Sequence, residues 1–261
     1  MSLITLLTDF GRRDHYVAVM KGVMLQIAPQ ARLIDITHEI NPQDVVHAAF
    51  VLRQAWSWFP AGSVHLAVVD PGVGSSRRIL AGRYAGRFVV APDNGLISMV
   101  HRELPLEAMH VVDNRNYALA NVSATFHGRD ILAPAAAHVA AGLPLQKLGP
   151  STDHLEILQL AGPQTEQDFG ISGRILCADH FGNLITNISR QHLLAIYQHR
   201  AEVQVYLDEV CIGPVRSSYH EVAGGQPLAL IGSSDYLEIS VNRGSARETL
   251  APADEAVVRV R

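Results

Sequence analysis

A change in hydrophobic pattern near the middle of the chain constrains the fold more than any other sequence feature. In the first half, apolar runs of strand length alternate with amphipathic segments of helical period. That alternation predicts a mostly parallel sheet covered by helices. In the second half, short strand-like runs are separated by Gly and Pro, and helical periodicity is sparse. We therefore expect an α/β protein: an N-terminal α/β domain with a mostly parallel central sheet, and a smaller C-terminal all-β domain that is a β-barrel or a sandwich.

The polar segment Pro150–Asp168 lies between the two patterns and is the best linker candidate. We expect an N-terminal domain over residues 1–155, a linker over 156–168 and an all-β domain over 169–261. In the first domain we expect strands at Leu3–Leu7, Leu33–Ile36, Val64–Val69 and Phe88–Ala91, and helices at Asp14–Ala28, Asn41–Phe59 and Gly128–Ala141. In the second domain we expect strands at Gly173–Cys177, Ala201–Leu207, Pro227–Ile231, Tyr236–Val241 and Ala256–Val260.

The composition excludes several classes of protein. Of 261 residues, 48% are hydrophobic and 18% are charged, which is typical of a globular chain. A formal net charge of −4 without a run of Lys or Arg argues against a nucleic-acid partner. No apolar run approaches the roughly 20 residues of a membrane helix, and the N-terminus lacks the basic start of a signal peptide. Cys177 and Cys211 are expected to be buried thiols, and the chain is expected to be cytoplasmic.

The segment Val69–Arg77 carries the strongest sign of chemistry. A strand-like run ends in Asp70, and a turn rich in Pro and Gly follows at once. The turn is short enough to fold the Arg77 guanidinium back toward the Asp70 carboxylate. An acid at the tip of a buried strand is a usual place for chemistry in an α/β protein. The alternative is a structural Asp that caps the turn.

Polar residues also gather at other strand-to-loop transitions. Asp9 follows the first strand and can accept two ribose hydroxyls, or it can be a turn residue. His127 precedes a helix and can act as a general base or orient a water, although with 13 histidines an incidental role is the alternative. The segment Ala178–Asn187 holds an acid, an aromatic and two amides, which suit a cation, a ring and an adenine edge. Ala91–Gly95 is typical of a turn with a helix cap.

A metal site is the competing interpretation. Asp9, Asp70, His127 and Asp179 are chemically suitable ligands for a hard cation or zinc. No His-x-His, His-Glu-x-x-His or Cys-x-x-Cys spacing occurs, and Arg77 would compete for the Asp70 carboxylate. Neither a Walker loop nor a G-x-G-x-x-G turn is present. We therefore expect neither a metal nor a cofactor.

Taken together, the motifs resemble one family over nearly the whole chain. The chain is similar to S-adenosyl-L-methionine (SAM) hydrolases, also called SAM hydroxide adenosyltransferases, which are related to the SAM-dependent fluorinase and chlorinase. The matching segments, in order, are Thr8–Gly11, Asn41–Asp44, Asp70–Gly74, Pro92–Leu96, Phe126–Asp130, Asp179–Asn183 and Gly232–Ile239.

The resemblance implies a reaction and an assembly. Water or hydroxide attacks C5′ of the ribose, and SAM becomes adenosine and L-methionine, which leaves as a neutral thioether. An Asp–Arg–His set positions the water, and its matches here are Asp70, Arg77 and His127. The family also implies a C-terminal β-barrel domain and a homotrimer, with each site at a subunit interface between one N-terminal domain and a neighbour's C-terminal domain. Whether Asp70 or His127 takes the proton stays open.

The resemblance also implies substrate-binding residues. Asp9 would bind the ribose hydroxyls, and Asp179 and Ser233 would hold the methionine ammonium and carboxylate. The adenine and ribose rings would be contacted by Phe126, Phe181, Asn183, Tyr219, Glu238 and Val241, the last through its backbone.

Departures from the halogenases favour water as the nucleophile. The halogenases carry Tyr at the Asp70 position, and the fluorinase has Ser at the Gly128 position. The fluorinase also has Arg at the Ser234 position, a departure that concerns how the methionine carboxylate is held beside Ser233. An anionic Asp70 would repel a halide about 4 Å away by roughly 4 kcal/mol at an intermediate dielectric. Two alternatives stay open: a halide-using adenosyltransferase, and a SAM or adenosine-binding protein with little turnover. A metal-dependent phosphoesterase is more distant.

Overall fold

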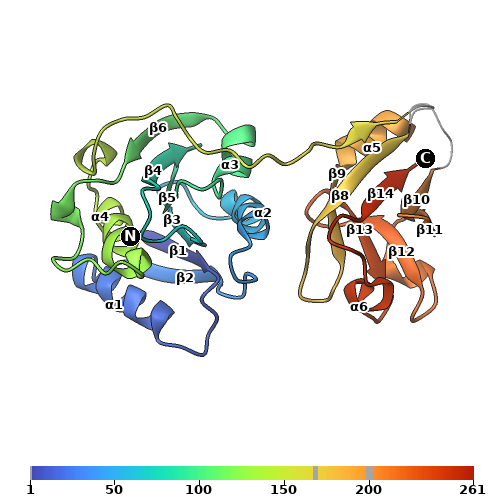
Figure 1. The fold of residues 1–261 in the computed structure, drawn as a ribbon, viewed down its shortest axis with the longest axis horizontal. Helices are drawn as coiled ribbons and strands as arrows, with labels where there is room; N and C mark the ends of the chain where they lie inside the picture. The colour runs from blue at the N-terminus through green and yellow to red at the C-terminus, as the bar shows by residue number, and fades with distance from the viewer. Residues whose placement is uncertain (1, 167–169, 198–202) are drawn as a thin grey trace. The chain divides into compact units, whose positions relative to one another are not determined.

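The chain divides into two compact units, Met1–Gln159 and Leu160–Arg261 (Figure 1). The computed structural model describes residues 2–166, 170–197 and 203–261. Within these ranges, none of the helices is long and apolar enough to cross a membrane.

The first unit is built on a sheet whose strands run in the order β2-β1-β3-β5-β4-β6. β1 pairs in parallel with β2 and β3, and β3 pairs in parallel with β5, whereas β4 runs antiparallel to both of its neighbours. The predicted mostly parallel sheet is therefore confirmed. The strands are β1 (Leu3–Thr8), β2 (Arg32–Thr37), β3 (Val64–Val68), β4 (Ile79–Tyr84), β5 (Arg87–Pro92) and β6 (Leu106–Val111).

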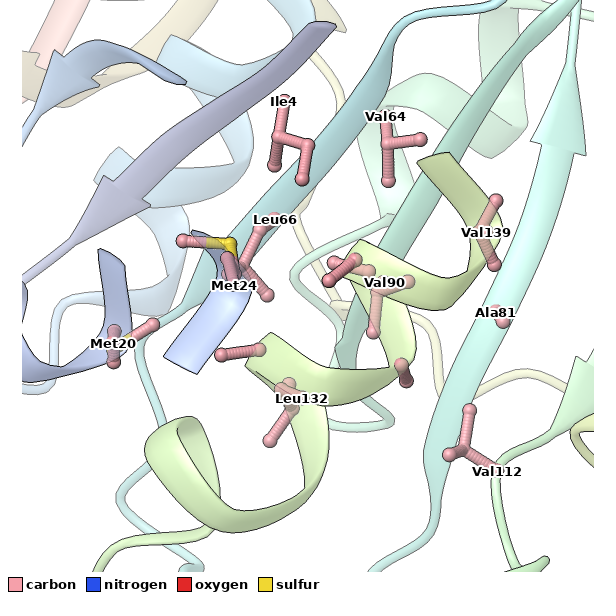
Figure 2. Packing of buried hydrophobic residues seen from close by; sticks show 14 of the residues in the cluster. Ile4, Met20, Met24, Val64, Leu66, Ala81, Val90, Val112, Leu132 and Val139 are labelled. Atoms are coloured by element: carbon pink, nitrogen blue, oxygen red, sulfur yellow. The ribbon is translucent and has the colours of Figure 1, made fainter. Parts of the chain in front are cut away.

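Helices cover both faces of this sheet because its central strands are apolar on both sides. Leu6 of β1 belongs to one core and its neighbour Leu7 to the other, as strand alternation requires. Figure 2 shows the first core, in which α1 and α4 pack against β1 and β3. The second core lies under α2 and α3. The helices are α1 (Tyr16–Ile27), α2 (Val45–Trp56), α3 (Ser98–Glu103) and α4 (Ala133–Ala140), with short turns at η1 (Arg115–Tyr117), η2 (Gly128–Leu132) and η3 (Leu145–Lys147).

Two helix starts differ from expectation. α2 begins at Val45 rather than Asn41, and its cap is Asp44, whose Oδ1 accepts the His47 N–H at 2.9 Å. Gln43 adopts a φ of 68°, so the segment after Asn41 cannot be helical. α1 begins at Tyr16, without a side-chain cap.

The strands β4 and β6 are missing from the sequence-based prediction. β4 turns into β5 through Ala85 and Gly86, whose φ values of 45° and 75° fit a two-residue hairpin of the primed type. Ala-Gly is a weak signal for such a turn, so the hairpin was not expected from sequence. The early part of the expected helix Gly128–Ala141 is a π-helical turn, η2.

The second unit is a closed barrel, as predicted. Its strands form the ring β14-β10-β11-β12-β13-β9-β8, closed by pairing of β14 with β8. The two strands β12 and β13 match the prediction to the residue, and the expected Ala201–Leu207 strand is β10, although residues 201–202 lie outside the described ranges. The strands are β8 (Ile171–Ala178), β9 (Leu184–Ser189), β10 (Gln204–Leu207), β11 (Val210–Arg216), β12 (Pro227–Ile231), β13 (Tyr236–Val241) and β14 (Val257–Val260).

Several smaller elements complete the second unit. The sequence signals missed β9, β11 and the helices. Of the two cysteines, Cys177 is buried as expected, but Cys211 is exposed, contrary to prediction. The additional elements are β7 (Gln164–Thr165), which pairs with β8, and the helices α5 (Arg190–Tyr197), η5 (Tyr219–Glu221) and α6 (Ala246–Leu250).

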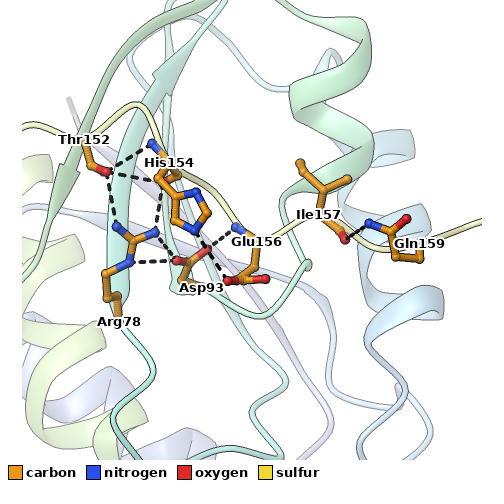
Figure 3. Close-up of polar contacts among 7 residues, drawn as sticks. All are labelled: Arg78, Asp93, Thr152, His154, Glu156, Ile157 and Gln159. Atoms are coloured by element: carbon orange, nitrogen blue, oxygen red, sulfur yellow. Dashed lines mark hydrogen bonds and ion pairs between the residues drawn. The ribbon is translucent and has the colours of Figure 1, made fainter.

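The end of the first unit is fastened to its sheet by polar contacts (Figure 3). Arg78 donates to Asp93 Oδ2 and to the His154 carbonyl oxygen at 2.9 Å each, and to Thr152 Oγ1 at 3.2 Å. The other Asp93 oxygen accepts the Glu156 N–H at 2.8 Å. Residues 156–159, which sequence assigns to the linker, therefore lie in the first unit.

A buried histidine couples the stability of this unit to pH. His65 of β3 is fully buried, with Nδ1 2.7 Å from Thr5 Oγ1 and its ring against Trp56. Burial, reinforced by the charge of Arg87, lowers the pKa of His65 to about 3. In the unfolded state the pKa of His65 is near 6.5, so below that pH the unfolded state binds a proton that the folded state does not bind.

We predict that His65 by itself lowers the stability of the first unit by about 2 kcal/mol between pH 7 and pH 5, because its imidazole gains a proton in that window only in the unfolded state. His65→Gln should flatten this dependence. Urea unfolding followed by tryptophan fluorescence measures it, since both tryptophans, Trp56 and Trp58, belong to the first unit. An equal pH slope in wild type and variant would contradict the prediction.

Candidate active site

Two carboxylates lie where the order of the parallel strands reverses. From β1 the chain crosses to β2 on one side and later returns to β3 on the other side. Asp9 directly follows β1, and Asp70 comes two residues after β3. Since β1 and β3 are parallel neighbours, both carboxylates lie at the same edge of the sheet. In open α/β sheets, ligands bind at such a switch point.

The turn after β3 folds Arg77 onto Asp70, as the sequence predicts. Arg77 Nε lies 2.8 and 2.9 Å from the two Asp70 oxygens, and its Nη2 also donates to Asp70 Oδ2. Within the turn, Ser75 donates its N–H and its hydroxyl to the Gly72 carbonyl oxygen, at 3.1 and 2.7 Å. The side chains of Asp70 and Arg77 are only 6% and 10% exposed, so the pair is nearly dry.

Glycines allow a second segment to approach this turn. Gly74 has a φ of 80°, and a side chain there would collide with the Ala124 carbonyl oxygen. A Cβ at Gly128 would lie 3.3 Å from Val68 of β3. The tight approach and the π-helical turn that starts at Gly128 bring His127 against the Asp70–Arg77 pair. Such π-helical turns are frequent at functional sites.

The contact between Arg77 and His127 sets the tautomer of the histidine. Arg77 Nη2 lies 3.0 Å from His127 Nδ1. A guanidinium only donates, so Nδ1 must accept, and in the neutral ring the proton lies on Nε2. Burial and the neighbouring Arg77 charge lower the pKa of His127 below 6.5, which favours this neutral form at pH 7.

Asp70 and His127 line a cavity of about 400 Å³ in the first unit, with Arg77 behind them. Asp9 takes part through a carboxylate whose Oδ2 accepts the Gln43 N–H at 2.8 Å. Burial, together with the nearby Asp70 charge, raises the pKa of Asp9, although the Gln43 hydrogen bond opposes this shift. The cavity is lined by Asp9, Phe10, Tyr16, Pro42, Gln43, Val68, Asp70, Pro71, Val73, Thr125, Phe126, His127 and Gly128.

One wall of the cavity is aromatic. The rings of Phe10, Tyr16 and Phe126 meet at centroid distances of 5.2 to 5.8 Å. Sequence reasoning singled out Phe126 but missed Phe10 and Tyr16. Phe10 could have been found from its place beside Asp9, whereas Tyr16, the first residue of α1, carries no local signal.

The second unit gathers its own polar residues in the loop between β8 and β9. Asp179 Oδ1 accepts the N–H groups of Phe181 and Asn183, and its Oδ2 accepts the Asn183 side-chain amide, all at 2.9 Å. Much of the acceptor capacity of Asp179 therefore organises its own loop. Phe181 is 73% exposed, and Asn183 is buried.

Tyr219 and Glu238 form a second polar group in this unit. The Tyr219 hydroxyl donates to Glu238 Oε1 at 2.6 Å, and Ser240 donates to the same oxygen at 2.8 Å. Burial and the Glu238 carboxylate raise the pKa of Tyr219 to about 12, and Asp179 adds to the shift. Ser233 is exposed in the turn after β12, and the Val241 side chain is buried in the barrel core.

Metal binding gains no support from the described side chains. No group of three or more His, Cys, Asp or Glu residues among them is arranged to hold an ion. In the cavity, the Asp70 oxygens are already engaged by Arg77.

These features define a class of enzyme with two units. The first is an α/β unit that carries an acid, a guanidinium and an imidazole, and the second is a small barrel. The chain belongs to the SAM hydroxide adenosyltransferase family. The model of the family's N-terminal domain matches residues 4–149, and the model of its C-terminal domain matches residues 173–259.

Named relatives cover almost the full length of the chain. It is 41% identical over 100% of both chains to (R)-S-adenosyl-L-methionine hydrolase of Thermus thermophilus. It is 30% identical to a fluorinase of Actinoplanes sp., over 92% of this chain and 91% of the relative. An uncharacterized conserved protein from Thermotoga maritima has a crystal structure that superposes with a TM-score of 0.90 at 36% identity, covering 98% of this chain and 99% of that one.

We predict that Asp70 and Arg77 depend strongly on one another. Arg77→Gln should destabilise the first unit by about 3 kcal/mol, because it leaves a buried carboxylate unpaired. Adding Asp70→Asn should then cost far less than it does alone, which a double-mutant cycle in urea measures. The partly exposed pair Arg53–Glu103 is the control and should couple by less than about 1 kcal/mol. Additive costs at Asp70 and Arg77 would contradict the prediction.

Proposed function

We propose that this protein hydrolyses S-adenosyl-L-methionine to adenosine and L-methionine, with water or hydroxide attacking C5′ of the ribose. The contact chain Asp70–Arg77–His127 beside a cavity of suitable size carries the proposal. Membership of the SAM hydroxide adenosyltransferase family and the hydrolase name of relatives 33–41% identical support it.

The chemistry asks little of the protein beyond positioning. The sulfonium leaves as a neutral thioether, so no general acid is needed. The water must lie in line with the C5′–S bond, and one of its protons must have an acceptor. The His127 side chain at the cavity wall supplies the first requirement, and the fixed Asp70 carboxylate supplies the second.

The His127 tautomer assigns the two roles. Because His127 Nδ1 accepts from Arg77, its Nε2–H is a donor that can orient the water oxygen. The Asp70 carboxylate is then the acceptor of the water proton as the C5′–O bond forms and the C5′–S bond breaks. Arg77 fixes Asp70 in place and neutralises its charge.

The remaining contacts follow the family pattern. Asp9 binds the ribose hydroxyls and Phe126 contacts the rings. The proposed contacts of the second unit are Asp179, Phe181, Asn183, Tyr219, Ser233, Glu238 and Val241. We further propose a homotrimer with its sites at the subunit interface, no bound metal or cofactor, and a cytoplasmic location, which the exposed thiol of Cys211 fits.

A halide-using adenosyltransferase is the second candidate within enzymes. Since Arg77 neutralises Asp70, charge repulsion of a halide is weaker than an isolated carboxylate would give. A carboxylate still cannot donate a hydrogen bond to an anion, so Asp70 favours water over halide.

The deciding experiment is chromatography of products after incubation with SAM, first without halide and then with chloride or fluoride. Both sulfonium epimers are tested, because the names of the relatives specify the (R) form. Equal amounts of adenosine and methionine, unaffected by halide or chelator, support the proposal. A 5′-halo-adenosine favours the halogenase. Retained SAM or adenosine without product favours a binding protein.

We predict that Asp70→Asn lowers kcat by about 10² to 10⁴, the usual range for a lost general base, while adenosine affinity stays near wild type. His127→Gln should lower kcat less than His127→Ala does, because the side-chain amide of Gln can still donate a hydrogen bond to the water. Steady-state kinetics and calorimetry of adenosine binding separate the effects. Lost adenosine binding in Asp70→Asn would make Asp70 a substrate clamp.

We also predict that, as the pH falls, kcat/KM reaches half of its plateau value only below pH 6.5. The pKa of His127 is lowered, so the neutral ring that accepts from Arg77 persists past its ordinary value of 6.5. A pH profile of the wild-type enzyme tests this. A decline that begins above pH 7 would contradict the assigned protonation state.

A further inference from the structure

A chain of polar contacts leads from the surface of the first unit to the end of β1. Lys21 Nζ lies 2.7 Å from Asp35 Oδ2, and Asp35 Oδ1 lies 3.1 Å from His38 Nε2. His38 Nδ1 lies 2.8 Å from Thr8 Oγ1. The chain thus joins an ion pair on α1 and β2 to the residue directly before Asp9.

The order acid, imidazole, hydroxyl is that of a nucleophilic triad, but burial excludes that role. Thr8 is 0% exposed and His38 is 2% exposed. A nucleophile must reach its substrate, and neither side chain lines the cavity of the candidate active site. The contacts must therefore act on their protein neighbours.

Those neighbours form the loop that carries Asp9. Thr8 Oγ1 accepts the Phe10 N–H at 3.3 Å, and the His38 carbonyl oxygen accepts the Gly11 N–H at 2.7 Å. Thr8 can then donate its own proton to His38 Nδ1, which leaves the Nε2–H facing Asp35 at ion-pair distance but outside hydrogen-bond geometry. The Thr8–His38 contact and the two backbone hydrogen bonds hold the loop on both sides of Asp9.

We propose that His38, backed by Asp35 and Lys21, is a positioning residue that fixes the Asp9–Gly11 loop in the substrate cavity. The inference rests on the proposed function, in which Asp9 binds the ribose hydroxyls. It adds that the placement of this carboxylate depends on a buried imidazole and on a partly exposed ion pair behind it.

The same strand offers a matched control. Thr5 of β1 makes an equivalent contact, with its Oγ1 2.7 Å from His65 Nδ1, and both residues are fully buried. Thr5 lies inside the strand and holds no loop of the cavity. Removal of the Thr5 hydroxyl therefore measures how much a buried Thr–His contact contributes to the free energy of unfolding, without an effect on the cavity.

The test compares Thr8→Val, Thr8→Ser and Thr5→Val. Val keeps the shape of Thr without its hydroxyl, and Ser keeps the hydroxyl. We expect Thr8→Val to raise KM for SAM and the Kd of adenosine about tenfold, the worth of one lost hydrogen bond, with Thr8→Ser near wild type. Thr5→Val should lower only the unfolding midpoint. If Thr8→Val binds normally, or Thr8→Ser is the worse variant, Thr8 acts by packing and the proposal is overturned.

Hydrogen exchange separates this inference from the proposed function. In the ligand-free protein, Thr8→Val should speed exchange of the Phe10 and Gly11 amides, and Thr5→Val should not. Asp35→Asn, a milder change at a partly exposed position, should act in the same direction. Unchanged exchange in both Thr8→Val and Asp35→Asn would overturn the inference. Altered exchange in a protein whose wild type does not bind or convert SAM would support the loop's anchoring and refute the proposed function.

Discussion

The buried ion pair of Asp70 and Arg77 is the interaction on which the site depends. A carboxylate at the tip of an apolar strand would be costly without a counter-charge, and the short turn after β3 supplies one. The geometry of that turn requires a glycine at position 74, and the glycine in turn admits the segment that carries His127. Ion pair, turn and imidazole are therefore joined by direct contacts, and the arginine is the residue common to the ion pair and the imidazole contact.

Local signals were sufficient for much of the fold. Strand–helix alternation identified the parallel strands of the first unit, and short runs between Gly and Pro identified the barrel, with β12 and β13 correct to the residue. The contact between Arg77 and Asp70 was also predictable, because a short turn rich in Pro and Gly brings the Arg77 side chain back beside the Asp70 carboxylate.

What the sequence could not give depends on partners distant along the chain. The start of α2 is displaced because Asp9 takes the Gln43 N–H, a contact that no window around Asn41 contains. The tautomer of His127 is set by Arg77, fifty positions away. The motif presents Asp179 as an acid suited to a cation, but three donors from its own loop form hydrogen bonds with its oxygens. The contribution of Tyr16 to the cavity appears only when α1 is packed.

The adjacent arginines at the end of the turn hold different parts of the molecule. Arg77 holds the carboxylate of the candidate active site, and Arg78 holds Asp93 and the last segment of the first unit. One inserted or deleted residue between Asp70 and Arg78 would shift both side chains and exchange their surroundings. A change of length in this turn would therefore disturb the candidate active site and the end of the first unit at once, so the spacing matters here as well as the identity of the residues between.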